Sequence, residues 1–188
     1  MISEGKPFPA SYQVRQLDEL PASAEVTELC PAGRTGTGGL IFEVDLGDGD
    51  SWVGFARPTS IGSRNAVAGL FSTPDPDRLC VITQGAAYLV DVATRRFVLL
   101  SLSDPVIFVT SLTDVGLLLL ATPWRVLAIG RDGPAWRTER LAIDGLRLDE
   151  TDGSRLVGVA DPDSPEPREF VVDLLNGSHR GGATVRQQ

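Results

Sequence analysis

The chain has 188 residues, of which 42% are hydrophobic and 22% charged, and 25 acidic against 17 basic residues give a formal net charge of −8. A chain of this length can bury a substantial core in one domain. The acidic balance argues against nucleic-acid binding, because phosphate backbones are bound by basic surfaces. The sequence shows neither an apolar leader nor an apolar run long enough for a membrane helix, so we expect a soluble cytoplasmic protein.

Residues 1–39 lack a clear periodic pattern and are expected to be irregular. One short helix is predicted over Ser23–Leu29, with Ser23 as its N-cap. The glycine-rich stretch Gly33–Gly39 raises the question of a phosphate-binding loop. Such a loop needs a following helix and usually a lysine, whereas a strand-like segment follows here, so a flexible entry loop is the favoured interpretation.

The segment Leu40–Leu46 alternates apolar and polar residues, which predicts a half-buried strand. We expect it to pair with Trp52–Ala56 as a hairpin. The intervening Asp45, Asp48 and Asp50 resemble part of a calcium loop, but the spacing and closing glutamate of an EF-hand are missing. A hairpin turn is therefore favoured over a calcium site.

The rest of the chain passes three times through one pattern, over residues 66–104, 105–144 and 145–182, and ends in a tail at 183–188. Each copy has the pattern of four short strands separated by turns, and the first turn of each copy is acidic. A period of about 40 residues with four strands per unit is typical of a β-propeller blade. We therefore predict an all-β repeat domain over residues 40–182, with about three four-stranded antiparallel blades and an N-terminal hairpin as a candidate partial blade.

The best-matched element is the third strand of each copy, Tyr88–Val92, Val126–Gly130 and Phe170–Leu174. In the first and third copies it includes an aspartate, Asp91 or Asp173, before a turn of small residues. This pattern resembles the repeats of quinoprotein-type and WD40-type propellers, although the second copy lacks the aspartate and the Gly-His and Trp-Asp dipeptides of WD40 repeats are absent.

The resemblance implies stacked four-stranded blades and carries over no active-site residue. The stretch Trp136–Gly182 is also similar to uncharacterised bacterial proteins, which adds no role. Closed propellers use at least four blades, so three architectures stay open: a fourth, atypical blade from the N-terminal strands, an open capped array, or closure shared between chains. Exposed strand edges favour association, so a homodimer fits the last two.

Catalytic signals are weak in this chain. There is one histidine, His179, and no Gly-x-Ser-x-Gly elbow, which restricts nucleophilic triads. Cys30 and Cys80 are expected to be free thiols, and this inventory does not make a four-ligand zinc site, so we predict no metal and no cofactor. The many carboxylates leave glycoside cleavage open, although most aspartates fall in turns.

Five residues are the candidate binding residues, namely Trp52, Trp124, Arg125, Trp136 and Arg137. Exposed Trp and Arg clusters are common hot spots of protein interfaces, and an exposed tryptophan can also stack on a sugar. The alternative is that the tryptophans pack between neighbouring blades, and this interpretation is favoured.

The sequence therefore predicts a non-catalytic protein-binding module. Its acidic charge suits a basic partner reached by electrostatic steering, as for a bacterial immunity or inhibitor protein. A carbohydrate-binding or carbohydrate-cleaving propeller and a structural subunit of a larger assembly remain as alternatives.

Overall fold

The computed structural model of the protein describes residues 5–22, 25–30, 38–47, 49–59, 65–100 and 104–183. The chain divides into two compact units: the N-terminal unit, Pro7–Val106, and the C-terminal unit, which comprises Ile107–Gln188 and Met1–Lys6. Each unit contains two four-stranded sheets packed face to face around one core. The predicted all-β class is confirmed.

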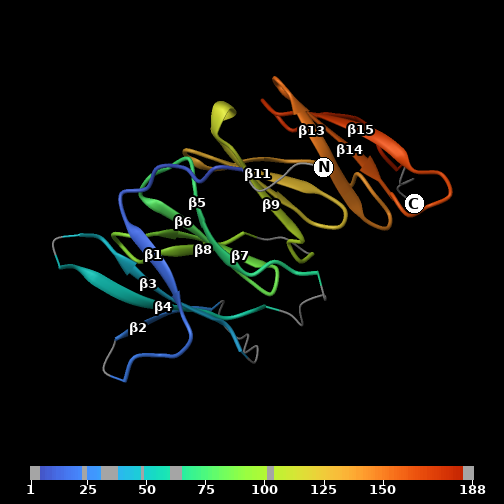
Figure 1. Ribbon diagram of the computed structural model, residues 1–188. Helices are drawn as coiled ribbons and strands as arrows, with labels where there is room; N and C mark the ends of the chain where they lie inside the picture. The colour runs from blue at the N-terminus through green and yellow to red at the C-terminus, as the bar shows by residue number, and fades with distance from the viewer. Residues whose placement is uncertain are drawn as a thin grey trace. The chain divides into compact units, whose positions relative to one another are not determined.

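Sheet 1 belongs to the N-terminal unit and has the strand order β1-β3-β4-β2 (Figure 1). Its strands are β1 (Gln13–Leu17), β2 (Val26–Leu29), β3 (Leu40–Asp45) and β4 (Ser51–Ala56). The β3–β4 hairpin is the one predicted from the alternating sequence. Its turn contains Gly47 and Gly49, which have φ angles of 82° and 83° that favour glycine. Strand β2 is the exception in this sheet, because it pairs parallel to β4.

Sheets 2, 3 and 4 are antiparallel meanders, in which each strand pairs with the next along the chain. Sheet 2 completes the N-terminal unit with β5 (Gly69–Ser72), β6 (Arg78–Thr83), β7 (Ala86–Asp91) and β8 (Phe97–Leu99). Sheet 3 contains β9 (Phe108–Leu112), β10 (Leu117–Ala121), β11 (Val126–Gly130) and β12 (Gly133–Arg137). Sheet 4 contains β13 (Leu146–Asp152), β14 (Arg155–Ala160), β15 (Arg168–Asp173) and β16 (His179–Gly181). A short 3₁₀ turn, η1 (Thr113–Val115), joins β9 to β10.

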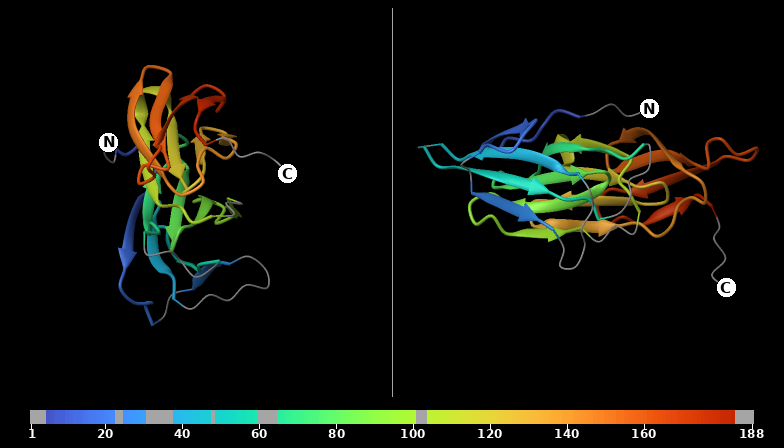
Figure 2. Two further views of the ribbon diagram at one scale, coloured as in Figure 1. Left: turned by 90° about the vertical axis from the view of Figure 1, so that its right-hand side faces the viewer. Right: turned by 90° about the horizontal axis from the view of Figure 1, so that it is seen from below.

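The strands of the three meanders fall within the three predicted sequence copies, and Figure 2 shows the strands of each sheet side by side. The predicted count of about three blades and a hairpin is not matched exactly, because strands from the first 65 residues form a complete fourth sheet. Each of the four sheets is open, with an edge strand on both sides in the part of the chain that the structure describes.

One N-terminal expectation needs correction. Residues 26–29 of the predicted helix form strand β2, while Ser23, its expected N-cap, lies outside the described residues. Val26 and Thr27 are β-branched, and their pairing with β4 outweighs the local helical pattern. Most of the glycine-rich loop also lies outside the described residues, and its last residues, Gly38 and Gly39, lead directly into β3.

The core of the N-terminal unit lies between sheets 1 and 2. Alternate residues of β3 and β4 face alternate residues of β6 and β7, as the two-residue period of a strand requires. The buried members are Tyr12, Leu29, Leu40, Phe42, Val44, Trp52, Ala56, Leu79, Val81, Tyr88, Val90 and Val92. This core fixes sheets 1 and 2 against each other.

The core of the C-terminal unit follows the same plan between sheets 3 and 4. Its members are Leu117, Leu119, Ala121, Val126, Ala128, Leu141, Ala142, Leu148, Leu156, Ala160, Phe170, Val172 and Leu174. Strands β10 and β11 are the most completely buried strands of this unit. No helix in the described part of the chain is long and apolar enough to cross a membrane.

A glycine opposite a phenylalanine recurs in both units. Gly54 pairs with Phe42 across β3 and β4, and Gly158 pairs with Phe170 across β14 and β15. In each pair the phenylalanine ring occupies the space that a Cβ atom on the glycine would need. The ring therefore packs directly on the neighbouring backbone, which only glycine permits.

Candidate functional site

Two of the three tryptophans join neighbouring sheets inside a unit. The indole N–H of Trp52 on β4 donates to the carbonyl oxygen of Val92 at 3.0 Å, and that of Trp136 on β12 donates to the carbonyl of Leu174 at 2.8 Å. Val92 directly follows Asp91, the last residue of β7, and Leu174 directly follows Asp173, the last residue of β15. Trp52 is only 3% exposed and Trp136 packs on the core of its unit. For these two residues the interpretation of packing between sheets is confirmed.

Trp124 lies in the β10–β11 turn and is half-buried. The guanidinium of Arg140 lies 5.0 Å from its ring centroid, in a cation–π contact. Arg140 also donates from Nε to the carbonyl of Ala142 at 2.8 Å and from Nη2 to that of Ile143 at 3.2 Å. Arg140 therefore contacts the Trp124 indole and, through its two hydrogen bonds, also fixes the backbone of the loop that leads to β13.

The two arginines predicted as binding residues lie near this turn. Arg125 is half-buried, and its backbone N–H donates to Thr122 Oγ1 at 3.0 Å. Arg137 ends β12, pairs with Leu127 and is exposed. Trp124, Arg125 and Arg137 thus share one end of sheet 3, whereas Trp52 belongs to the N-terminal unit. Their role in binding stays a prediction.

A second candidate is the edge of the N-terminal unit at which its hairpin turns meet. The first and third turns of a meander lie at the same edge, and the Val92 N–H donates to the Asp77 carbonyl at 3.1 Å across them. The β3–β4 turn of sheet 1 joins this edge through the Trp52–Val92 bond. We call this edge, with its carboxylates, the acidic turn edge: Asp45, Asp50, Asp75, Asp77 and Asp91.

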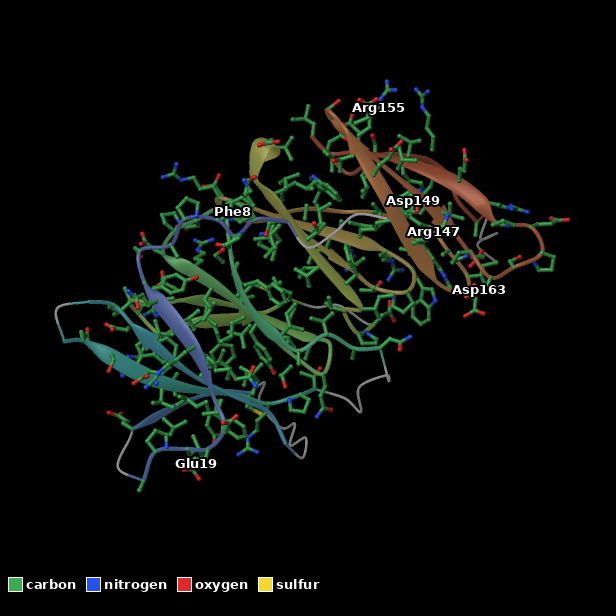
Figure 3. All side chains as sticks on the ribbon, viewed as in Figure 1. Phe8, Glu19, Arg147, Asp149, Arg155 and Asp163 are labelled. Carbon is green, nitrogen blue, oxygen red and sulfur yellow. The ribbon has the colours of Figure 1, made fainter. Side chains whose placement is uncertain are left out.

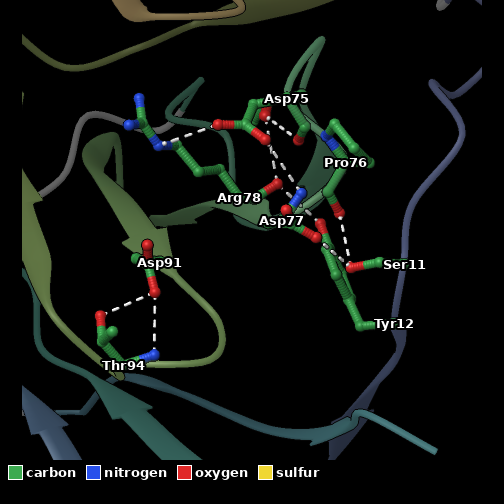
Figure 4. A network of polar contacts seen from close by, with 9 residues as sticks. Ser11, Tyr12, Asp75, Pro76, Asp77, Arg78, Asp91 and Thr94 are labelled. Carbon is green, nitrogen blue, oxygen red and sulfur yellow. Dashed lines mark hydrogen bonds and ion pairs between the residues drawn. The ribbon is translucent and has the colours of Figure 1, made fainter.

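Hydrogen bonds hold several of these carboxylates in fixed positions (Figure 4). Asp75 accepts the backbone N–H of Asp77 at 3.1 Å and pairs with Arg78 at 3.2 Å. Asp77 in turn accepts the hydroxyl of Ser11 at 2.6 Å, which ties the segment before β1 to sheet 2. The Tyr12 hydroxyl donates to the Arg78 carbonyl at 2.9 Å, so this junction is anchored on both sides.

The acidic turn edge also holds arginines, namely Arg78, Arg95 and Arg96. Five carboxylates against three guanidinium groups leave the edge negative. Arg95 lies 5.9 Å from the ring centroid of Trp52, so its charge is drawn toward the indole. The edge presents carboxylates on several short turns, which suits recognition of a positively charged surface.

A shallow depression of about 370 Å³ adjoins this edge on sheet 1. It is lined by Gln13, Val14, Arg15, Glu43, Asp45, Gly49 and Ser51. Arg15 pairs with Glu43 at 2.6 Å, so this carboxylate already has a cationic partner within the chain. Asp45 accepts the N–H of Gly47 at 2.8 Å. The depression therefore offers carboxylate, amide and hydroxyl groups, the groups that bind a cationic side chain.

Asp91 is held ionised by its own turn. Its Oδ1 accepts the hydroxyl of Thr94 at 2.7 Å and the backbone N–H of Thr94 at 2.8 Å. These bonds, with Arg78 nearby, lower the pKa of Asp91 below the usual value of an aspartate. Because the folded state favours the ionised form, the turn contributes stability above pH 3.8 and loses it as the pH falls through the folded-state pKa.

Replacing Thr94 with valine removes the hydroxyl donor and is expected to raise the pKa of Asp91 toward its usual value. The free energy of unfolding at pH 7 should fall by about 0.5–1 kcal/mol, since the turn is partly exposed. The difference from the unsubstituted protein should vanish once Asp91 is protonated at low pH. Carboxyl NMR titration checks the pKa, and Thr94→Ser, which keeps the hydroxyl, is the matched control. An unchanged pKa in the valine variant would contradict this assignment.

The remaining reactive groups are placed unfavourably for nucleophilic chemistry. Cys30 and Cys80 are not joined in a disulfide, and burial raises the pKa of the Cys80 thiol to about 12, so this thiol stays protonated. Tyr88 donates to the Arg57 carbonyl at 2.6 Å, and its pKa is raised to about 12, mainly by burial. Among the residues that the structure describes, no three or more His, Cys, Asp and Glu side chains are grouped to hold a metal ion.

No protein-family model matches the chain. No curated protein matches its sequence either.

Proposed function

We propose that the protein is a non-catalytic, propeller-type binding module that takes a basic protein partner on the acidic turn edge. The single observation that carries the proposal is the acidic turn edge, whose turns are linked by the Val92–Asp77 and Trp52–Val92 hydrogen bonds and whose Asp45 also lines the depression on sheet 1. An arginine or lysine of the partner enters the depression, and Asp45 and the neighbouring oxygens accept its hydrogen bonds. The surrounding carboxylates steer the partner toward this position.

The overall charge of −8 supports the same partner class. An acidic protein that masks a basic partner fits an inhibitor or immunity role, in which electrostatic steering gives fast association. The four sheets, three of them meanders, also support a blade-type architecture with four blades in this chain. Propellers display their turns at the two ends of the blades, and the acidic turn edge gathers such turns within one unit.

The test is a binding comparison between the unsubstituted protein and the double variant Asp45→Lys/Asp50→Lys. Asp45 ends β3 and Asp50 lies in the β3–β4 turn, and both are exposed, so the changes reverse charge without entering the core. The immobilised unsubstituted protein should retain a basic partner from the host lysate, and salt should elute that partner. The double variant should retain about tenfold less of the same partner, or still less.

The matched control is Asp114→Lys, an exposed carboxylate in the η1 turn of the C-terminal unit. This variant should retain the same partner as the unsubstituted protein. Identical retention by all three proteins, or retention that salt does not weaken, would contradict the proposal and direct attention to glycans and to the Trp124 end of sheet 3.

A further inference from the structure

The outer face of sheet 4, opposite the core of the C-terminal unit, carries apolar residues. Leu156 and Ala160 of β14 and Phe170 and Val172 of β15 face the core, so the intervening residues face away from it. These include Val157, Val159 and Val171, all only half-buried. We call this outward side of sheet 4 the valine face.

On the valine face, residues that lie opposite one another on neighbouring strands form rows, and the charged residues have fixed places in these rows. One row runs Glu150–Val157–Val171–Arg180 across β13, β14, β15 and β16, because each residue lies opposite the next in the register. Its acidic end and its basic end thus lie at opposite edges of the sheet, with two valines between them. Directly opposite residues share one face, so all four side chains are presented together.

The neighbouring row, at the hairpin end, runs Asp152–Arg155–Asp173. Figure 3 shows Arg155 at this end of the β13–β14 hairpin, with Arg147 and Asp149 farther along β13. Arg147 pairs with Asp149 at 2.7 Å, so part of the β13 rim is already neutralised within the chain. The charge pattern along the rows is therefore set mainly by Glu150, Arg155, Asp173 and Arg180.

We propose that the valine face binds the same face of a second copy of this chain, as a two-fold symmetric dimer. A two-fold axis parallel to the strands and between the two copies places β13 opposite β16 of the partner subunit and β14 opposite β15 of the partner subunit. Glu150 then faces Arg180 of the partner subunit, and Val157 faces Val171 of the partner subunit. In the next row, Arg155 faces Asp173 of the partner subunit.

This match is the reason for choosing a second copy as the occupant. A symmetric interface must be self-complementary, and here Glu150 meets Arg180 of the partner subunit, Arg155 meets Asp173 of the partner subunit, and Val157 meets Val171 of the partner subunit. Sheet 1 differs on its outer face, since its own Arg57 lies 4.7 Å from the Phe55 ring centroid and pairs with Glu28 at 3.1 Å. That arginine already covers the aromatic ring within the chain.

The area of the face sets the expected affinity. Four strands about 4.8 Å apart and about six residues of about 3.4 Å each give a patch of about 400 Å² per subunit. Two such patches fall below the size of standard stable interfaces. We therefore expect a dimer with a dissociation constant in the micromolar range that is weakened by salt.

The test is sedimentation velocity of the full chain at increasing concentrations, with Glu150→Arg, Arg180→Glu and the double variant Glu150→Arg/Arg180→Glu. Each single reversal opposes like charges and should weaken the dimer about tenfold or more. The double variant restores opposite charges at both ends of the row and should recover the affinity to within a few-fold. Val171→Lys should also abolish the dimer, because it places a charge at the apolar centre.

Two controls keep the result interpretable. Far-UV circular dichroism checks that each variant is folded, and Arg15→Glu on sheet 1 should leave the dimer unchanged. A protein that stays monomeric at several hundred micromolar would overturn the proposal. So would a dimer that is indifferent to the single reversals, or single reversals whose effects the double variant does not reverse.

Discussion

Replacing Trp52 with alanine is expected to lower the free energy of unfolding of the N-terminal unit by about 3–5 kcal/mol. The indole is 3% exposed and contacts Phe42 edge to face, with ring centroids 5.6 Å apart. Its removal leaves a cavity between sheets 1 and 2 and deprives the Val92 carbonyl of its indole donor. Hydrogen exchange of the amides of β7, measured with denaturant unfolding, reports the loss in this unit.

Two matched variants separate the contributions. Trp52→Phe keeps an aromatic ring but removes the indole N–H, and should cost about 1–3 kcal/mol. Trp124→Ala should cost clearly less than Trp52→Ala, because that indole is half-buried in a turn. A Trp52→Ala variant that unfolds within 1 kcal/mol of the unsubstituted protein would show that the indole is not a core residue.

Replacing Gly54 with alanine is expected to cost about 2–3 kcal/mol, through overpacking rather than through backbone strain. The added Cβ atom would overlap the ring of Phe42, which lies across the hairpin. Gly158→Ala should behave in the same way against Phe170, because the C-terminal unit contains the same pair. Denaturant unfolding of each variant measures the cost.

A double-mutant cycle identifies the ring as the cause. On a Phe42→Leu background, Gly54→Ala should cost less than in the unsubstituted protein, since the ring is gone. Gly47→Ala is the control for backbone strain, because a Cβ there meets nothing within 4 Å while φ is +82°, and it should cost about 1 kcal/mol. Equal costs of Gly54→Ala in the two backgrounds would refute the ring as the cause.

The strands that could be predicted from the sequence carry their own local signal. The alternating Leu40–Leu46 segment predicts a strand buried on one face. The continuously apolar β10 and β11 predict strands buried on both faces. By contrast, β1 and β2 are short edge strands, stabilised by pairing with β3 and β4. Such non-local pairing leaves little trace in the sequence of the strand itself, which explains the missing fourth sheet.

The acidic turn edge could be predicted from the sequence only in part. The acidic residues Asp75 and Asp77 can be seen in the sequence as a first turn, and Asp91 as the end of a third strand. Their meeting at one edge follows from the meander, in which the first and third turns share an edge. The β3–β4 turn joins them through the Trp52–Val92 bond, which depends on how two sheets stack. Sequence spacing alone does not report that stacking.

The tryptophan–carbonyl bond also bears on how such a chain can grow. It spans 40 residues in the N-terminal unit and 38 in the C-terminal unit, and ends on the residue after a strand-ending aspartate in both. In each unit, the two sheets are thus joined by a tryptophan–carbonyl hydrogen bond of their own. Lengthening the chain by a whole two-sheet unit requires no new kind of contact, whereas adding a single sheet would leave it without a matching tryptophan.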